Sequence, residues 1–498
     1  MSTAQLDLRP DTLTPRSVVA AAALLAAALG LLAEALANSA IPTQAVIWGG
    51  LALAAYAIGL MFLMRFWHGA GLARWRFGPW ILVWYGITFG LATVTWSQPQ
   101  VGPVAQIAVS SVLRALWLLA VGLSVWTLGY FVGPGRLARS AATRVVMALR
   151  RRLAAEVRSP AAPWILYAIG SAARLASAAV TGRFNYLGDA SSALNTANSY
   201  GQILAVLNYW APLAVAAAAM QVFRERLRGA RITLTVLFLL ELGVSIASAD
   251  KENFVIAVVV VIVPYSASRR HLPKGAIGVI ILAFLAVIIP FNATYRNVVR
   301  SGSITLTPAQ AVSEAPGIFR QTLSAQNVVT SVPDSFNYLL GRIREIDTPA
   351  IIMQRTPGQI PFGSWLDLAE APLLELVPRA IWPDKPILDD GYRVNQEYYG
   401  QPATSYSSDA VTPIGSLYQY GGWIPVIVGM FLFGIGVRLL DDVLDVRTNP
   451  HAIFLVVLLF PTVVAAEGDW VLLLASTPAT LLSWVLALYL TFRRRNLA

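Results

Sequence analysis

Long uncharged apolar segments dominate the chain, and they constrain its fold more than any other feature. Each is close to the roughly 20 helical residues that cross the hydrocarbon core of a bilayer. Only 13% of the 498 residues are charged and 56% are hydrophobic, which leaves too little polar surface for a water-soluble protein of this size. Composition therefore excludes soluble enzymes and nucleic-acid-binding proteins, and it predicts an all-α polytopic membrane protein. We place twelve transmembrane segments at 18–37, 43–63, 79–96, 105–132, 161–181, 200–222, 231–248, 253–267, 275–292, 423–440, 452–466 and 471–491.

Positive charge alternates between the connections and predicts their side of the membrane. Cytoplasmic connections are enriched in Lys and Arg. The second, fourth, sixth and eighth connections and the C-terminal tail are basic, whereas the connections at 38–42 and 97–104 carry no basic residue. Both termini are therefore predicted to be cytoplasmic. The Arg-rich segment 135–158 is expected to be an amphipathic helix on the inner leaflet, with docking of a cytoplasmic partner as the alternative.

One connection is far longer than the others and divides the chain. We expect helices 1–9 in residues 1–292, a large, partly helical periplasmic loop in 293–422, and helices 10–12 with a cytoplasmic tail in 423–498. The loop carries nine basic and twelve acidic residues, so its composition is not that of a flexible linker. Helix starts are predicted after Pro333-Asp334 and after Gly363-Ser364.

Four charged residues fall inside the predicted spans, where a charge is costly and usually functional. Arg114, Arg174 and Glu241 lie in the outer halves of their spans, and Glu34 lies near an outer edge. This placement predicts a polar funnel that opens outward. The alternative is an interhelical pair, for instance Arg174 with Glu241, that holds the helices together.

Three further cations lie at the outer ends of predicted spans. Lys251 follows the span at 231–248, and Arg296 and Arg300 follow the span at 275–292. Arg offers a planar fork of donors and Lys a point charge, so these residues would suit a phosphate or pyrophosphate at the membrane surface. The alternative is that they anchor the helix ends at the interface.

The long loop contains the other candidates. Three prolines within PRAIWPDKP, residues 378–386, would present Arg379, Asp384 and Lys385 on a stiff backbone. Aromatic residues interleaved with polar ones suit a sugar site, although an interfacial aromatic belt is the alternative. Arg342 with Glu345 and Arg344 with Asp347 are interpreted as surface helix pairs, and Asp389-Asp390 as a solvated turn. The sugar-binding candidates are Arg342, Trp382, Lys385, Arg393, Tyr399 and Tyr418.

PRAIWPDKP and the later TPIGSLY, residues 412–418, resemble bacterial O-antigen and exopolysaccharide repeat-unit polymerases of the Wzy type. The predicted span number, the long outer loop and the basic positions at Lys251 and Arg296 are similar to those polymerases as well. The resemblance implies a metal-independent glycosyltransferase of the GT-C-like membrane class in the bacterial inner membrane. Its substrates would be undecaprenyl-pyrophosphate-linked oligosaccharides, and a chain-length regulator and a flippase of the same pathway would be partners.

The resemblance implies transfer of a growing glycan onto the sugar end of a new lipid-linked unit, with release of undecaprenyl pyrophosphate. Cations would stabilise that leaving group, and a carboxylate would take the proton of the acceptor hydroxyl. The chain has no Cys, so a Cys-ligated metal is excluded, and neither a metal nor a cofactor is expected. A related ligase, and a twelve-span transporter or flippase of lipid-linked oligosaccharide, are the alternatives. The pyrophosphate-binding candidates are Lys251, Arg296, Arg300, Arg379, Arg174 and Arg114, and the candidate catalytic carboxylates are Asp409, Asp384 and Glu397.

Overall fold

The computed structural model confirms that the protein is helical and rich in long apolar helices. Every regular element in the described part of the chain is a helix. Nine helical segments among the described residues are long and apolar enough to cross a membrane. The structure describes residues 15–68, 72–154, 156–157, 159–181, 184, 201–248, 251–300, 308–322, 335–377, 381–382, 390–402, 409–464 and 468–492.

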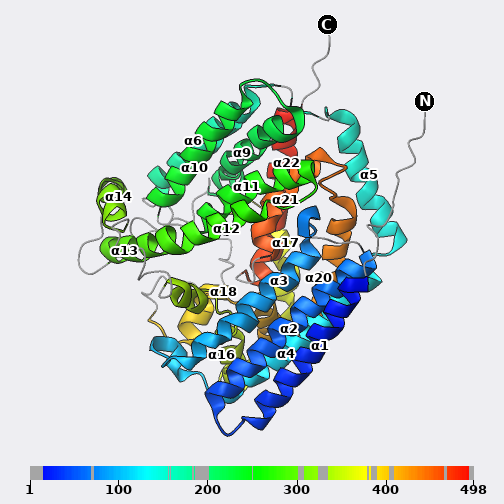
Figure 1. Ribbon diagram of the computed structural model, residues 1–498, viewed down its shortest axis with the longest axis vertical. Helices are drawn as coiled ribbons and strands as arrows, with labels where there is room; N and C mark the ends of the chain where they lie inside the picture. Colours follow the sequence, from blue (N-terminus) through cyan, green and yellow to red (C-terminus); the bar gives the residue numbers. More distant parts are fainter. Residues whose placement is uncertain are drawn as a thin grey trace.

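The first four predicted spans form one side of the molecule, where α1, α2 and α4 run side by side (Figure 1). The third span is irregular: α3 continues as a π-helical turn, η2, and then as a 3-10 helix, η3. Gly90, between them, approaches α2 so closely that a Cβ would lie 2.7 Å from the backbone nitrogen of Ala54. Close backbone packing therefore accompanies the change in helical winding. The bounds are α1 Pro15–Ala37, α2 Pro42–His68, α3 Phe77–Tyr85, η2 Gly86–Gly90, η3 Leu91–Ser97 and α4 Val109–Val132.

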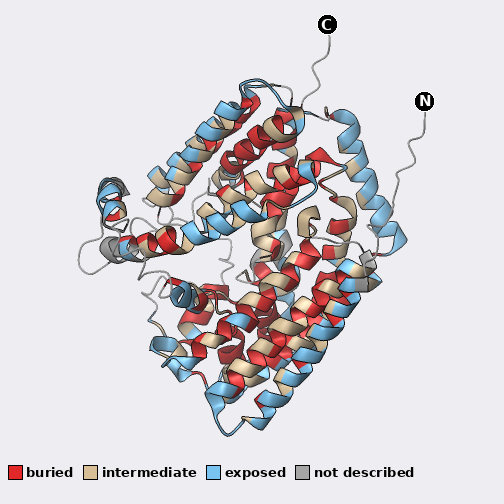
Figure 2. Cartoon of the chain, viewed as in Figure 1, coloured by how far each residue is buried: buried red, intermediate tan, exposed pale blue. Residues whose placement is uncertain are grey.

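A second group of helices follows, with α9 at its centre. All eleven residues of α9 are buried, as the red ribbon in Figure 2 shows. An element that is apolar on every side needs neighbours on every side, and α6, α10, α11 and α21 all pack against it. The bounds are α6 Ala162–Thr181, α8 Gly201–Asn208, α9 Trp210–Met220, η5 Gln221–Glu225, α10 Ala230–Ala247, α11 Lys251–Arg269, α12 Lys274–Ala283, η6 Phe284–Ile288, α13 Ile289–Arg300 and α14 Pro308–Thr322.

The C-terminal helices return to both groups. α20, Trp423–Val443, packs along α4, and α21, Pro450–Val464, lies against α9 and α11. α22, Trp470–Thr491, completes the described C-terminal part. In sequence, six of the twelve predicted spans precede residue 225 and six follow it. In the structure, α20 to α22 contact both the early helices and the later ones.

The contact between α4 and α20 depends on two glycines. A Cβ at Gly434 would fall inside the contact distance of the carbonyl oxygen of Trp126, and a Cβ at Gly129 would meet the carbonyl oxygen of Phe431 in the same way. Small residues of this kind let two helices approach at backbone distance. The helices could not pack as they do with larger side chains at these positions.

Gly434→Val is therefore expected to destabilise the protein by about 1–3 kcal/mol, because the added side chain must push α20 away from α4. The measurement is the thermal unfolding midpoint in detergent. Gly436→Val is the matched control, since Gly436 lies on the same helix with open space beside it. Equal midpoints for the two variants would contradict this account of the contact.

A buried carboxylate joins the start of α3 to α4 and α20. Asp441 of α20 accepts hydrogen bonds from the backbone nitrogens of Phe77 and Gly78, at 2.6 and 3.0 Å, and from Tyr130 Oη at 2.8 Å. The first amides of a helix lack partners within the helix, and a negative charge is stabilised there by the helix dipole. Asp441 thus fixes where α3 begins.

The long segment between α13 and α20 returns to the helices. α16, Asp347–Arg355, packs on α4 and on α19, Pro413–Gln419, and α17, Trp365–Leu376, runs along α22. Gln354 of α16 accepts a hydrogen bond from the backbone nitrogen of Ala108, just before α4, at 2.8 Å. Residues 335–342 are helical, and Ser364 caps α17 by accepting from Leu366, so helices are found close to both predicted starts.

The Arg-rich segment is α5, Arg136–Arg152, which lies at the edge of the molecule with no buried residue (Figures 1 and 2). Its apolar residues include Leu137, which is 85% exposed. The helix predicted here is confirmed. Its position on a membrane surface stays a prediction.

Candidate functional site

Asp409, one of the three candidate catalytic carboxylates, lies half-buried just before α19. Its backbone nitrogen donates to the carbonyl oxygen of Gly391 at 3.2 Å. Burial raises the pKa of its carboxyl group, and the positive charge of Arg342 partly offsets that rise. A raised pKa suits a carboxylate that must accept a proton near neutral pH.

Two further candidates lie in the same region. Arg342 is exposed at the end of the helix 335–342. Glu345, its partner in the predicted surface pair, is only 5% exposed, so the predicted surface position is wrong for Glu345. Tyr399 is buried, and its pKa is raised by that burial and also by the negative charges of Asp347 and Asp409. The structure thus brings Arg342, Tyr399 and Asp409 into one electrostatic neighbourhood.

The backbone beside Asp409 is strained. Thr412 has φ of 66°, in the left-handed region that a β-branched residue rarely adopts. Its hydroxyl accepts a hydrogen bond from the backbone nitrogen of Gly415 at 3.1 Å, which caps α19. Strain of this kind often occurs at functional sites and is maintained by the surrounding packing.

Arg344 and Asp347 form a pair, but the surface position predicted for it is wrong. Their side chains are only 7% and 9% exposed, and Arg344 Nη2 lies 2.7 Å from Asp347 Oδ2. Arg344 also donates to Thr95 Oγ1 at 2.8 Å and to Gln100 Oε1 at 2.7 Å. Its guanidinium lies 5.4 Å from the centre of the Trp96 ring. This buried network fixes the start of α16 to the end of η3.

A second buried carboxylate, Asp390, is the centre of another network, so the prediction of a solvated turn is wrong. It accepts from Ser416 Oγ at 3.2 Å, Gln419 Nε2 at 2.7 Å and Tyr420 Oη at 2.9 Å. Asp390 belongs to α18, Asp390–Arg393, and its partners belong to α19 and the residue that follows it. The network therefore ties the chain on both sides of Asp409 together.

Two sugar-binding candidates lie near the Asp390 network. The guanidinium of Arg393 lies 5.6 Å from the centre of the Tyr420 ring, and its Nε lies 3.6 Å from Glu397 Oε2. Glu397, a candidate catalytic carboxylate, is exposed in η7, Val394–Tyr398, and forms this ion pair with Arg393.

Tyr418 is 8% exposed. Burial raises the pKa of its hydroxyl group, and the charge of Arg114, which lies exposed on α4, partly offsets that rise. Trp382 is 40% exposed.

Arg174 forms the interhelical pair named as the alternative to a polar funnel. Its Nη1 and Nη2 donate to the two carboxylate oxygens of Glu241 at 2.7 and 3.0 Å. A bidentate pair neutralises both charges and joins α6 to α10. We therefore leave Arg174 out of the phosphate-binding set proposed below.

The remaining phosphate-binding candidates are only partly described. Lys251 begins α11, and Arg296 and Arg300 lie on α13, but their side chains fall outside the described structure. Arg379, Asp384 and Lys385 lie outside the described residues entirely. Tyr295 Oη donates to the carbonyl oxygen of Ala247 at 3.1 Å, which places the backbone beside Arg296 against the end of α10, four residues before Lys251.

These helices define a multi-pass helical membrane protein. Residues 183–443, slightly more than half of the chain, match the family described as Domain of unknown function (DUF8712), and the chain belongs to this family. The matched region begins after α6 and ends with α20, so it contains the whole segment that carries Asp409, Arg342 and Tyr399. No curated protein and no solved structure matches the chain.

Proposed function

We propose that the protein polymerises oligosaccharide repeat units carried on undecaprenyl pyrophosphate, at the outer face of a bacterial inner membrane. The observation that carries this proposal is the position of Asp409: a half-buried carboxylate with a raised pKa, close to Arg342 and Tyr399, on a segment held by two buried networks. The sequence resemblance to Wzy-type polymerases supplies the substrate class. A ligase of the same class would differ in its acceptor.

In this proposal Asp409 acts as the general base. The acceptor hydroxyl oxygen forms a bond to the anomeric carbon of the growing glycan, and the bond from that carbon to the phosphate oxygen breaks. The hydroxyl proton passes to Asp409, and undecaprenyl pyrophosphate leaves with the bonding electron pair. Cations must stabilise the charge that develops on this leaving group. Arg114 is the described candidate, with Lys251, Arg296, Arg300 and Arg379 as the further candidates.

The sugars would lie against the aromatic residues of the same segment. Trp382, which is 40% exposed, offers an apolar face, and Tyr399 and Tyr418, each 8% exposed, would present only their edges. Arg342 and Arg393 offer donors for hydroxyl groups. The second candidate function, a transporter or flippase, would place its binding charges near the membrane midplane. The close packing of α16 and α19 against α4 and α20 favours the polymerase, because it ties the described part of the long segment that contains these helices to the spans.

The topology proposed with this function has twelve spans and two cytoplasmic termini. Nine spans come from the long apolar helices. The other three are α6, with 20 residues, α21, with 15, and α22, with 22. They coincide with predicted apolar segments, and α21 is short enough to require local thinning of the bilayer or burial among neighbours.

The test is to incubate the purified protein with lipid-linked repeat units extracted from its source and to separate the products by length. We expect a ladder of glycans that differ by one repeat unit. Addition of EDTA should leave the ladder unchanged, because the proposed mechanism uses no metal ion. A single product of fixed length, transferred to another acceptor lipid, would identify a ligase, and the absence of any longer glycan would contradict the proposal.

A further inference from the structure

A pocket lies away from Asp409, where the α9 span ends and α6 and α10 begin. Its volume is about 380 Å³. The loop before α6, the turn η5 that ends the α9 span, and the first turn of α10 form its walls. Apolar spans end at the level of the lipid headgroups. The pocket therefore opens at the membrane interface, and the alternation of charge predicts that this is the cytoplasmic one.

The inside of the pocket offers hydrogen-bonding groups. Gln221 is 1% exposed, and its Nε2 donates to the carbonyl oxygens of Val157 and Ser159 at 3.2 and 2.9 Å. No described residue donates to its carboxamide oxygen, which is left as an acceptor. The hydroxyl of Thr233 lines the same pocket. Such a wall suits a ligand that carries hydroxyl groups.

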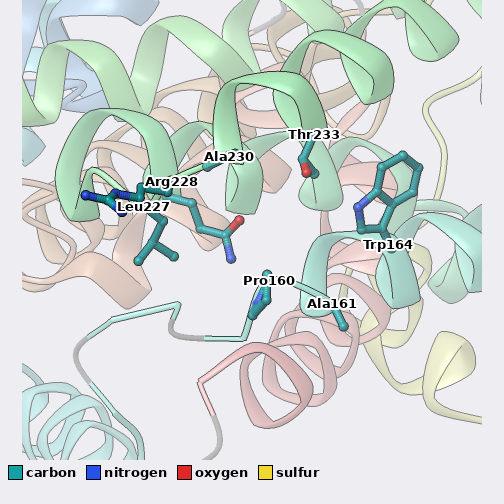
Figure 3. A pocket seen from close by; sticks show the side chains of 9 residues that line it. Pro160, Ala161, Trp164, Leu227, Arg228, Ala230 and Thr233 are labelled. Carbon is teal, nitrogen blue, oxygen red and sulfur yellow. The ribbon is translucent and has the colours of Figure 1, made fainter.

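The rim of the pocket carries the positively charged side chain of Arg228 and the indole ring of Trp164. Figure 3 shows Arg228 and Leu227 on one side of the pocket and Trp164 on the other, with the Arg228 guanidinium extended away from Trp164. Trp164 is 42% exposed, as is common for an indole at the headgroup level. The backbone nitrogens of Ala230, Ile232 and Thr233 already donate to the carbonyl oxygens of Leu227 and Gly229. The guanidinium of Arg228 is therefore the main donor that the pocket offers to an anion.

We propose that this pocket binds the headgroup of an anionic phospholipid of the phosphatidylglycerol class. The phosphodiester lies at the rim beside Arg228, and the glycerol hydroxyls enter toward Gln221 and Thr233. Basic pockets between membrane helices bind anionic headgroups in this way. Arg224 and Arg226 lie within four residues of Arg228 in the sequence and add to the positive charge of this connection. This site is independent of the function proposed for Asp409.

The test uses native mass spectrometry of the detergent-purified full-length protein titrated with dioleoyl phosphatidylglycerol. We expect one phosphatidylglycerol molecule to bind more tightly than any further ones. Dioleoyl phosphatidylcholine should show no such tight binding. Arg228→Ala should weaken that binding about tenfold, because it removes one charge-assisted hydrogen bond to the phosphodiester. Thr233→Leu should weaken it too, by filling the pocket. Arg231→Ala is the matched control, since Arg231 is exposed next to the pocket without lining it, and it should bind as the wild type does.

Two results would overturn the proposal. Equal losses from Arg228→Ala and Arg231→Ala would show that the lipid responds to general positive charge. Binding of glycerol 3-phosphate or inorganic phosphate as tightly as the lipid would show that the pocket takes a soluble phosphate compound. Thermal unfolding of each variant without lipid, with an unchanged midpoint, shows that the variants fold.

Discussion

Asp409→Asn is expected to reduce glycan polymerisation by about two to four orders of magnitude, the usual contribution of a general base. Asn has almost the same shape and leaves no charge in the half-buried site, so the fold should be unaffected. The measurement is the initial rate of ladder formation by purified protein in detergent or vesicles. Expression and the thermal unfolding midpoint should match those of the wild type.

A matched control for Asp409 is Glu370→Gln. Glu370 is exposed on α17, in the same long segment, and its replacement removes one negative charge of the same kind. We expect wild-type polymerisation from this variant. A full ladder from Asp409→Asn, or loss of the ladder in Glu397→Gln or Asp384→Asn instead, would contradict the role given to Asp409.

The pH dependence of the reaction provides a check on the same carboxylate. Burial raises the pKa of Asp409, and Arg342 lowers it. The base form is lost as the pH falls through this pKa, so activity should decline on the acid side at a higher pH than for an ordinary Asp. Arg342→Gln removes the lowering charge, so the decline in kcat should move to still higher pH. A movement to lower pH would contradict the electrostatic pairing of the two residues.

The helices were the easier part to predict from sequence, because a bilayer demands long apolar runs. The nine candidate spans all overlap segments that hydrophobicity alone defines. The winding of those helices was not predictable. The change from α3 to η2 and η3 accompanies the approach of Gly90 to α2. The division of the 200–222 segment into α8 and α9 falls at Tyr209, within an apolar run. Hydrophobicity does not record such contacts.

Residue type itself restricts which side chains are candidates for a site. Asp409, Arg342 and Tyr399 follow from the sequence as a carboxylate, a cation and an aromatic residue near one predicted membrane face. In the structure the charge of Arg342 acts on Asp409 and the charge of Asp409 acts on Tyr399, and the roles of the three residues stay a prediction. Asp390 was missed because an Asp-Asp-Gly sequence is typical of a solvated turn. Its partners Ser416, Gln419 and Tyr420 lie 26 to 30 residues further along the chain. Only the fold of the segment brings them together.

Arg344 shows why residue spacing alone does not distinguish a surface ion pair from a buried one. A separation of three residues from Asp347 is what a solvent-exposed helix pair would have. The groups that enclose the pair lie nearly 250 residues earlier in the chain: Thr95 and Trp96 belong to a predicted span, and Gln100 belongs to the connection that follows it. No signal in the sequence connects these distant positions. The pair was therefore assigned to the surface although it is among the most buried ion pairs described.

Arg344→Met is expected to destabilise the protein by about 3–5 kcal/mol, because it leaves Asp347 buried without its cation. Burial already raises the pKa of Asp347, and Arg344 is the largest influence that lowers it. The variant also frees Gln100 Oε1 and Thr95 Oγ1 from their bonds to the guanidinium. The measurement is thermal unfolding in detergent, where the midpoint should fall by several degrees.

Arg355→Met is the matched control on the same helix. Arg355 donates to Gln106 Oε1 at 2.8 Å at an exposed position, so its loss should cost no more than about 1 kcal/mol. Midpoints equally low for the two variants would show that the buried pair has no special importance. In the double variant Arg344→Met with Asp347→Leu, most of the lost stability should return, because no charge is then left buried.

The same double variant separates stability from catalysis. α16 carries Thr348, which hydrogen-bonds to Tyr399, and Tyr399 lies in the electrostatic neighbourhood of Asp409. If the pair only holds α16 in place, the double variant should recover polymerisation along with its unfolding midpoint. If the midpoint returns while the ladder stays absent, the charges of Arg344 and Asp347 themselves act on the site through Tyr399 and Asp409.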